Sequence, residues 1–175
     1  AGVLVSHSPG DVAELLRASD QVTERTMVEA RLDDGQHLLA LNEIFIGHPS
    51  HQTARYDLHT SDGSGEAQAS SGVIVATGSG ATGWCRSVAL ERHSGLSLPS
   101  PDEPRLAWFV REAWPSPATG TTLTEGELMG TELALTIKSD RLVAFGDGIE
   151  ADALTLTWGQ TVRVGQSTKA LRLVS

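Results

Sequence analysis

Residues 22–47 read VTERTMVEARLDDGQHLLALNEIFIG, and this stretch decides the fold. Apolar and polar residues largely alternate over residues 22–32, with the two-residue period of a strand that buries one face. Asp34-Gly35 is a hairpin-turn signal, and a mostly apolar run from Leu38 to Gly47 follows it. We therefore predict two antiparallel strands joined by a tight turn.

The rest of the chain continues this β-rich pattern, with turn residues such as Asp62-Gly63 and Ser139-Asp140 between short apolar runs. Helical character is confined to two segments, residues 10–19 and 84–93. Further strands are expected at residues 2–5, 54–60, 72–77, 106–114, 132–138, 141–145, 153–157, 161–164 and 170–174. The pattern predicts a mainly β fold, a distorted β-sandwich with two short helices, in a single domain of residues 1–175.

Composition and charge narrow the function classes. The 175 residues suit one domain, and 13 basic against 22 acidic residues give a net charge of -9. That balance argues against nucleic acid as the main partner, because nucleic acids need clustered Lys and Arg. No apolar run is long enough for a membrane span, and a single cysteine, Cys85, excludes an internal disulfide. We expect a cytoplasmic protein without a membrane partner and, because the chain opens directly on apolar residues 2–5, a further portion upstream.

The glycine-rich loop of residues 78–83 is the strongest chemical signal. It follows the apolar run 72–77 and opens a predicted helix, where free backbone N–H groups can cradle an anion. Its G-x-G-x-x-G spacing is weak evidence for a dinucleotide fold, since the acidic pair expected about 20 residues later, Asp102-Glu103, lies in a proline-rich loop. No lysine completes a P-loop. A purely structural turn remains the alternative.

Asn42-Glu43 is the second signal, because two polar residues interrupt the apolar run from Leu38 to Ile46. Neighbouring residues of a strand point to opposite faces, so at least one of the two must face inward or into a cleft. A polar side chain there needs a partner, and a ligand hydroxyl can supply one. The alternative is an edge-strand position with solvent contact.

Four other features are given structural interpretations. His48-Pro49-Ser50-His51 lacks a third ligand, so no metal site is predicted, and Cys85 is interpreted as a buried, inert thiol. Gly146-Asp147-Gly148 fits a hairpin turn between two strands. Trp84 and Trp114 are either core residues or a flat surface for a base; core is favoured, except that Trp84 directly follows the glycine-rich loop.

Together these residues resemble the C-terminal domain of the NAD kinase family, within the NAD kinase and diacylglycerol kinase-like superfamily. Leu41-Asn42-Glu43-Ile44 is similar to the family's L-N-E-[VI] motif, and residues 75–84 are similar to its V-S-T-P-T-G-S-T-A-Y motif. Residues 2–4 resemble the family's entering G-F-L strand, and residues 145–164 its closing D-G turn and strands.

The resemblance implies a β-sandwich domain of an enzyme that uses ATP, with Mg²⁺, to phosphorylate the 2′-hydroxyl of NAD. By resemblance, Asn42 and Glu43 contact the ribose and diphosphate region, and Trp84 lies beside the nucleotide. The implied substrate-binding set is Asn42, Glu43, Ser71, Thr77, Gly78, Ser79, Gly80, Thr82 and Trp84. Assembly into homodimers or homotetramers is also implied.

The departures from the family pattern concern the loop and the missing upstream motif. Thr77-Gly78-Ser79 stands for Thr-Pro-Thr, Ala81 for serine, Ser71 for aspartate and Trp84 for tyrosine. The family's G-G-D-G-T motif, which supplies the catalytic aspartate from an N-terminal α/β domain, is absent, so we predict that these 175 residues alone do not transfer phosphate and that no residue here is catalytic. A non-catalytic nucleotide-binding module, or a diverged kinase acting on a sugar or lipid, remains the alternative.

Overall fold

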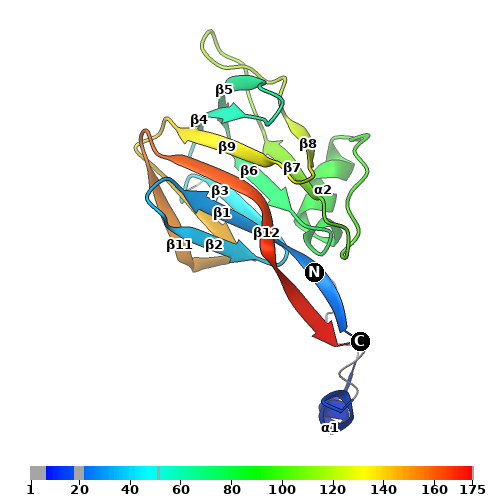
Figure 1. Cartoon of the computed structure of the whole chain (residues 1–175). Coiled ribbons are helices and arrows are strands. Elements are labelled where there is room, and N and C mark those ends of the chain that lie inside the picture. The colour runs from blue at the N-terminus through cyan, green and yellow to red at the C-terminus, as the bar shows by residue number, and fades with distance from the viewer. Residues whose placement is uncertain (1–6, 18–21, 51, 175) are drawn as a thin grey trace.

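The chain folds into two antiparallel sheets that pack face to face (Figure 1). The structure is a computed structural model that describes residues 7–17, 22–50 and 52–174. Sheet A has the strand order β2-β1-β12-β9-β4-β5, and sheet B has the order β11-β10-β3-β6-β7-β8. This arrangement confirms the predicted β-sandwich.

The strands are β1 (Val22–Leu32), β2 (His37–Ala40), β3 (Glu43–Gly47), β4 (Ala54–His59), β5 (Gly65–Ser70), β6 (Gly72–Ala76), β7 (Leu106–Arg111), β8 (Glu125–Leu128), β9 (Glu132–Ile137), β10 (Arg141–Gly146), β11 (Ile149–Thr157) and β12 (Thr161–Val174). The helical elements are η1 (Pro9–Asp11), α1 (Val12–Leu15), η2 (Gly80–Thr82) and α2 (Trp84–Glu91). The predicted helix at 10–19 is therefore shorter in the described residues, and the strand predicted at 2–5 lies outside them. None of these helices is long and apolar enough to cross a membrane.

The predicted strand from Leu38 to Gly47 is wrong in one respect, because it is two strands in different sheets. β2 pairs with β1 in sheet A, whereas β3 pairs with β10 and β6 in sheet B. The change of sheet occurs at Leu41-Asn42, where both backbone N–H groups donate to the Asp147 carboxylate, at 2.9 and 2.6 Å. A side chain more than 100 positions away thus supplies the partners that a continuous ladder would have supplied.

The C-terminal strands predicted at 161–164 and 170–174 are also wrong as separate elements. β12 runs through the intervening polar residues because β1 pairs with it from Val22↔Val174 to Leu32↔Val162, with a register shift between Thr26 and Val28. Figure 1 shows the paired ends of β1 and β12 extending away from the sandwich. The bulge absorbs the change of register, which a local pattern does not reveal.

β5 and β8 were not expected from the sequence. Their sequences, GEAQAS and EGEL, are poor in β-branched residues, so propensity gives no strand signal. Each is an edge strand whose partner specifies it, β4 for β5 and β7 for β8. Every strand pair described is antiparallel, which excludes a parallel dinucleotide-binding unit from this part of the chain.

Two apolar clusters organise the molecule. The larger lies between the sheets and includes Ile46 and Val75 of sheet B and Leu135 of sheet A. The smaller lies on the outer face of sheet B, where α2 packs over β6 and β7 through Cys85, Val88 and Ala89 (Figure 1). Because α2 covers only that half, the outer face over β3, β10 and β11 stays open.

Candidate functional site

Thr77 joins the two motifs singled out in the sequence. Its hydroxyl donates to the Leu41 carbonyl at 2.6 Å, and its backbone N–H donates to the Asn42 carbonyl at 2.9 Å. The side chain is fully buried. The polar pair Asn42-Glu43 and the glycine-rich loop, 35 residues apart, therefore form one structural unit.

The glycine-rich loop is closed by its own hydrogen bonds. The N–H groups of Ser79 and Gly80 donate to the Thr77 hydroxyl, at 3.2 and 3.3 Å, and the N–H of Ala81 donates to the Thr77 carbonyl at 2.8 Å. The N–H of Gly83 donates to Gly80. An anion held here would have to use the N–H groups in the first turn of α2, which have no partner within a helix.

Gly78 and Gly80 are explained by the chain's own backbone. A Cβ at Gly78 would lie 1.8 Å from the Ser100 carbonyl oxygen, and one at Gly80 would lie 2.2 Å from the Asn42 carbonyl oxygen. Neither glycine has a left-handed φ. The structural-turn alternative therefore accounts for glycine at both positions, and their contact with a ligand stays a prediction.

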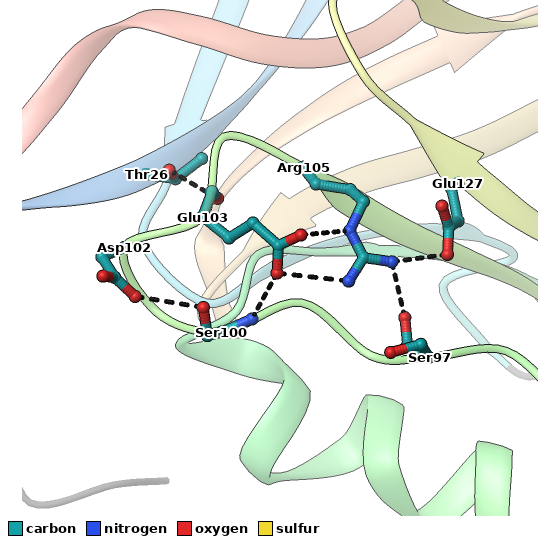
Figure 2. Close-up of polar contacts among 7 residues, drawn as sticks. All are labelled: Thr26, Ser97, Ser100, Asp102, Glu103, Arg105 and Glu127. Atoms are coloured by element: carbon teal, nitrogen blue, oxygen red, sulfur yellow. Dashed lines mark hydrogen bonds and ion pairs between the residues drawn. The ribbon is translucent and has the colours of Figure 1, made fainter.

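The proline-rich loop, whose Ser100 backbone packs against Gly78, is held in place by a buried arginine, Arg105 (Figure 2). Its guanidinium pairs with Glu103 at 2.8 Å and with Glu127 of β8, and it donates to the Ser97 carbonyl at 2.6 Å. Glu103 also accepts a hydrogen bond through its carbonyl from Thr26 of β1. The acidic pair in the proline-rich loop is thus structural: Glu103 ties this loop to both sheets, and its pKa is lowered chiefly by hydrogen bonding to Arg105.

Ser79 and Thr82 of the predicted set lie in the glycine-rich loop, whereas Ser71 lies at the other end of β6. The Ser79 hydroxyl is buried and has no hydrogen-bond partner among the described residues, whereas the Thr82 hydroxyl donates to the Ser79 carbonyl at 3.0 Å. Ser71 lies in the crossover between β5 and β6, where its N–H donates to the Arg111 carbonyl at 2.9 Å. The buried Ser79 hydroxyl therefore has unused hydrogen-bonding capacity among the described residues.

Glu43 begins β3 and faces the open outer side of sheet B. Strand alternation places it on the same face as Phe45, and burial raises its pKa, with a further contribution from nearby Asp147. Its carboxylate accepts no hydrogen bond from the described residues. The Gly146-Asp147-Gly148 segment is the predicted hairpin turn, and Asp147 takes a left-handed φ of 54° there.

A pocket of about 620 Å³ opens on the same outer face of sheet B; Phe45 lines it and Glu43 does not. Phe45 stacks on Trp84 with ring centroids 5.4 Å apart and contacts Phe145 at 5.1 Å. Arg111 lies 5.1 Å from the Trp84 ring. The lining residues are Phe45, His48, Pro49, Trp84, Arg111, Arg141, Val143, Phe145, Gly148, Glu150, Ala151, Ala153 and Thr155. An aromatic floor with cationic rims suits a planar base attached to an anionic group.

Of the predicted site residues, Trp84 alone lines this pocket. The sequence reasoning missed Phe45, Phe145, Arg111 and Arg141, because the apolar runs of β3 and β10 fit strands buried on both faces. The signal that could have found them is the alternation along each strand, which places all four side chains on the outer face of sheet B. Trp114 is 39% exposed, so its assignment to the core is wrong.

The remaining sequence features are mostly structural. Cys85 is fully buried, and burial, together with Glu43, raises its pKa to about 12, which confirms an inert thiol. The His48 ring nitrogen accepts from the Ser50 N–H at 3.1 Å, and His51 lies outside the described residues. Among residues 7–17, 22–50 and 52–174, no group of three His, Cys, Asp or Glu side chains is placed to hold a metal ion.

Comparison with known proteins bears on this arrangement. The chain is 29% identical over 153 residues to "NAD kinase 2, mitochondrial" of Rattus norvegicus, a match that covers 63% of this chain. The chain is a distant relative of an NAD kinase. The match spans 36% of the rat protein's own length, and no protein-family model matches the chain.

Proposed function

We propose that the chain is the nucleotide-binding β-domain of an NAD kinase-like phosphotransferase. The observation that carries this proposal is that Thr77 binds the backbone of Asn42, so the two family-like motifs meet, and Trp84, the last residue of the second motif, lines the aromatic pocket. The relationship to an NAD kinase supports NAD as the substrate. The reaction would be the transfer of a phosphate group from ATP to the 2′-hydroxyl on the adenosine ribose of NAD.

In this proposal, some residues of the site orient the ribose of the substrate and others stack on its base. Asn42 and Glu43 would hold ribose hydroxyls, for which the half-buried Glu43 carboxylate has free acceptor oxygens. Trp84 and Phe45 offer a stacked aromatic surface for a base. ATP and Mg²⁺ would supply positioning and charge stabilisation from outside these residues.

We propose no catalytic residue within the chain. A general base must lie within about 3 Å of the hydroxyl that it deprotonates, and the family resemblance places that aspartate upstream. The 175 residues are thus proposed to bind the acceptor without transferring phosphate. Homodimeric or homotetrameric assembly and a cytoplasmic location are part of the same proposal, although the rat relative is named as mitochondrial.

Isothermal titration of the 175-residue chain with NAD, NADP and ADP tests the proposal. Trp84→Leu removes the stacking surface and is expected to weaken binding about 5- to 150-fold, since base–aromatic stacking contributes about 1–3 kcal/mol. Asn42→Ala should also weaken binding while the free energy of unfolding changes little. Trp114→Leu is the matched control, because Trp114 lies outside the pocket.

The outcomes separate the competing functions. Binding of NAD that depends on Trp84 and Asn42 supports the kinase-related proposal. Binding of ADP without NAD favours a nucleotide-binding module of another kind. The proposal is overturned if no nucleotide binds, or if both variants bind like the native chain while Asn42→Ala mainly lowers the melting temperature.

A further inference from the structure

A second pocket adjoins the first at the end of the sandwich, where β4 of sheet A and β10 of sheet B begin. It measures about 330 Å³ and shares His48 and Arg141 with the aromatic pocket. Its lining residues are His48, Gln52, Thr53, Arg55, Lys138, Ser139, Asp140 and Arg141. The two pockets therefore form one groove, called here the outer groove, that begins at the aromatic residues and ends at the start of β4 and β10.

The far end of the outer groove carries an excess of positive charge. Arg55, Lys138 and Arg141 line it against the single acid Asp140, in a chain whose net charge is -9. Lys138 is partly neutralised by Asp57, at 3.2 Å. The guanidinium groups of Arg55 and Arg141 make no hydrogen bond or ion pair with any residue that the structure describes, although the Arg55 backbone N–H bonds Ser139. The guanidinium groups of Arg55 and Arg141 are thus available to bind an anion.

The aromatic end of the outer groove offers less free positive charge. Arg111, which lines it, is engaged by Glu112 at 3.3 Å and by the Trp84 ring. Glu150 adds an acid to the aromatic pocket. A phosphate group is therefore attracted more strongly to the Arg141 end of the groove than to its aromatic end.

The distance between the aromatic floor and the cations suits a nucleotide. Phe145, Val143 and Arg141 alternate along β10 and face the same side, so the Cα atoms of Phe145 and Arg141 are about 13 Å apart at ~3.3 Å per residue. A nucleoside carrying phosphates can bridge such a span.

We infer that the outer groove binds a nucleoside phosphate in one orientation, with the base on Phe45, Trp84 and Phe145 and the phosphates against Arg141 and Arg55. The inference rests on the proposed function in that the ligand is a nucleotide, and it adds the direction in which the ligand lies. Because a mononucleotide and a dinucleotide can present the same diphosphate, ADP and NAD are both probes.

Titration calorimetry with adenosine, ADP and NAD on the 175-residue chain tests the orientation. We expect ADP to bind more tightly than adenosine. Arg141→Gln should weaken ADP binding about 10- to 150-fold, because a charge-assisted bond to phosphate contributes about 1.5–3 kcal/mol, whereas adenosine binding should not change. Arg55→Gln should act in the same direction. Arg163→Gln, an exposed arginine of β12 in sheet A, is the matched control.

Each outcome decides the inference. A phosphate advantage that disappears in Arg141→Gln supports it, and the probe that loses affinity, ADP or NAD, identifies the source of the diphosphate. If adenosine and ADP bind equally and Arg141→Gln has no effect, the orientation is wrong while nucleotide binding stands. If none of the three probes binds, the proposed function itself fails.

Discussion

At the residue scale, Thr77 has the most connections in the candidate site. Its hydroxyl donates to Leu41 and accepts from the N–H groups of Ser79 and Gly80, and it is fully buried. One hydroxyl thus satisfies three backbone groups that would otherwise be buried without partners. Losing such partners costs more than the bonds contribute on average.

Thr77→Val is therefore expected to lower the free energy of unfolding by about 1–3 kcal/mol, because valine keeps the shape of the side chain and removes every hydrogen bond of the hydroxyl. Urea denaturation measures the change. Thr168→Val, at an exposed position of β12, should alter stability by less than about 0.5 kcal/mol. Equal effects of the two substitutions would show that the hydroxyl of Thr77 is not what joins the motifs.

Glu43 illustrates a conflict between stability and function at a single residue. Its pKa is raised by burial and by Asp147, so the folded chain disfavours the ionised carboxylate. The resulting loss of unfolding free energy is absent below the ordinary glutamate pKa of about 4.3, and it is complete once the pH exceeds the raised pKa of the folded state.

Glu43→Gln removes this ionisation and should make the chain more stable than the native one at pH 7. The difference in unfolding free energy between the variant and the native chain should shrink as the pH falls to about 4, where residue 43 is uncharged in the folded state of both. Urea denaturation at several pH values measures it, with the exposed Glu24→Gln as control. A variant that is less stable at pH 7 would show that the carboxylate has a stabilising partner.

At the scale of elements, the glycine-rich loop and the proline-rich loop support each other. Gly78 allows the backbone at Ser100 to approach, and Arg105 fixes that backbone to β1 and β8 through Glu103 and Glu127 (Figure 2). The start of α2, and with it Trp84, is thus positioned by a loop contact as well as by strand β6. Loops that position a site in this way depend on a rigid scaffold.

Gly78→Ala is expected to cost about 1–3 kcal/mol or more, because its Cβ would lie 1.8 Å from the Ser100 carbonyl oxygen and one backbone must move. Gly95→Ala is the control: no atom lies within 4 Å of its added Cβ, and a small gain of up to about 1 kcal/mol is expected. Thermal and urea denaturation compare the two. A neutral Gly78→Ala would mean that the loops are not in this contact.

At the scale of the whole molecule, one apolar cluster joins the two sheets. Leu135 of sheet A and Ile46 of sheet B are both fully buried within it. Neither sheet can separate without exposing the inner face of the other. We therefore expect the two sheets to unfold in a single transition.

Leu135→Ala and Ile46→Ala should each lower the unfolding free energy by about 2–5 kcal/mol, since each leaves a cavity in the shared core. Circular dichroism and fluorescence, to which the buried Trp108 contributes, should report the same midpoint in each variant. Leu171→Ala, at an exposed position near the end of β12, should have a small effect. Two separate transitions would contradict a shared core.

The two motifs of the candidate site were visible in the sequence because their signals are local exceptions. Asn42-Glu43 interrupts an apolar run, and the loop after β6 departs from strand composition. Phe45 and Phe145 are not exceptions, because aromatic residues in strands usually belong to a core, and a charged residue at the start of a strand, such as Arg141, is equally ordinary. They became candidates through their position on the half of sheet B that α2 leaves open.

The sequence by itself determined the β-rich class, most strand positions and the two motifs, since alternation, turn chemistry and polar interruptions act over a few residues. The tertiary structure decided which sheet each strand joins, where residues 37–47 divide, and that β12 is continuous. These outcomes depend on partners as remote as Val174 for Val22 and Asp147 for Leu41. The groove has the same origin: its aromatic floor and its cations come from β3, β4, β7, β10 and α2, which only the packed sandwich brings together.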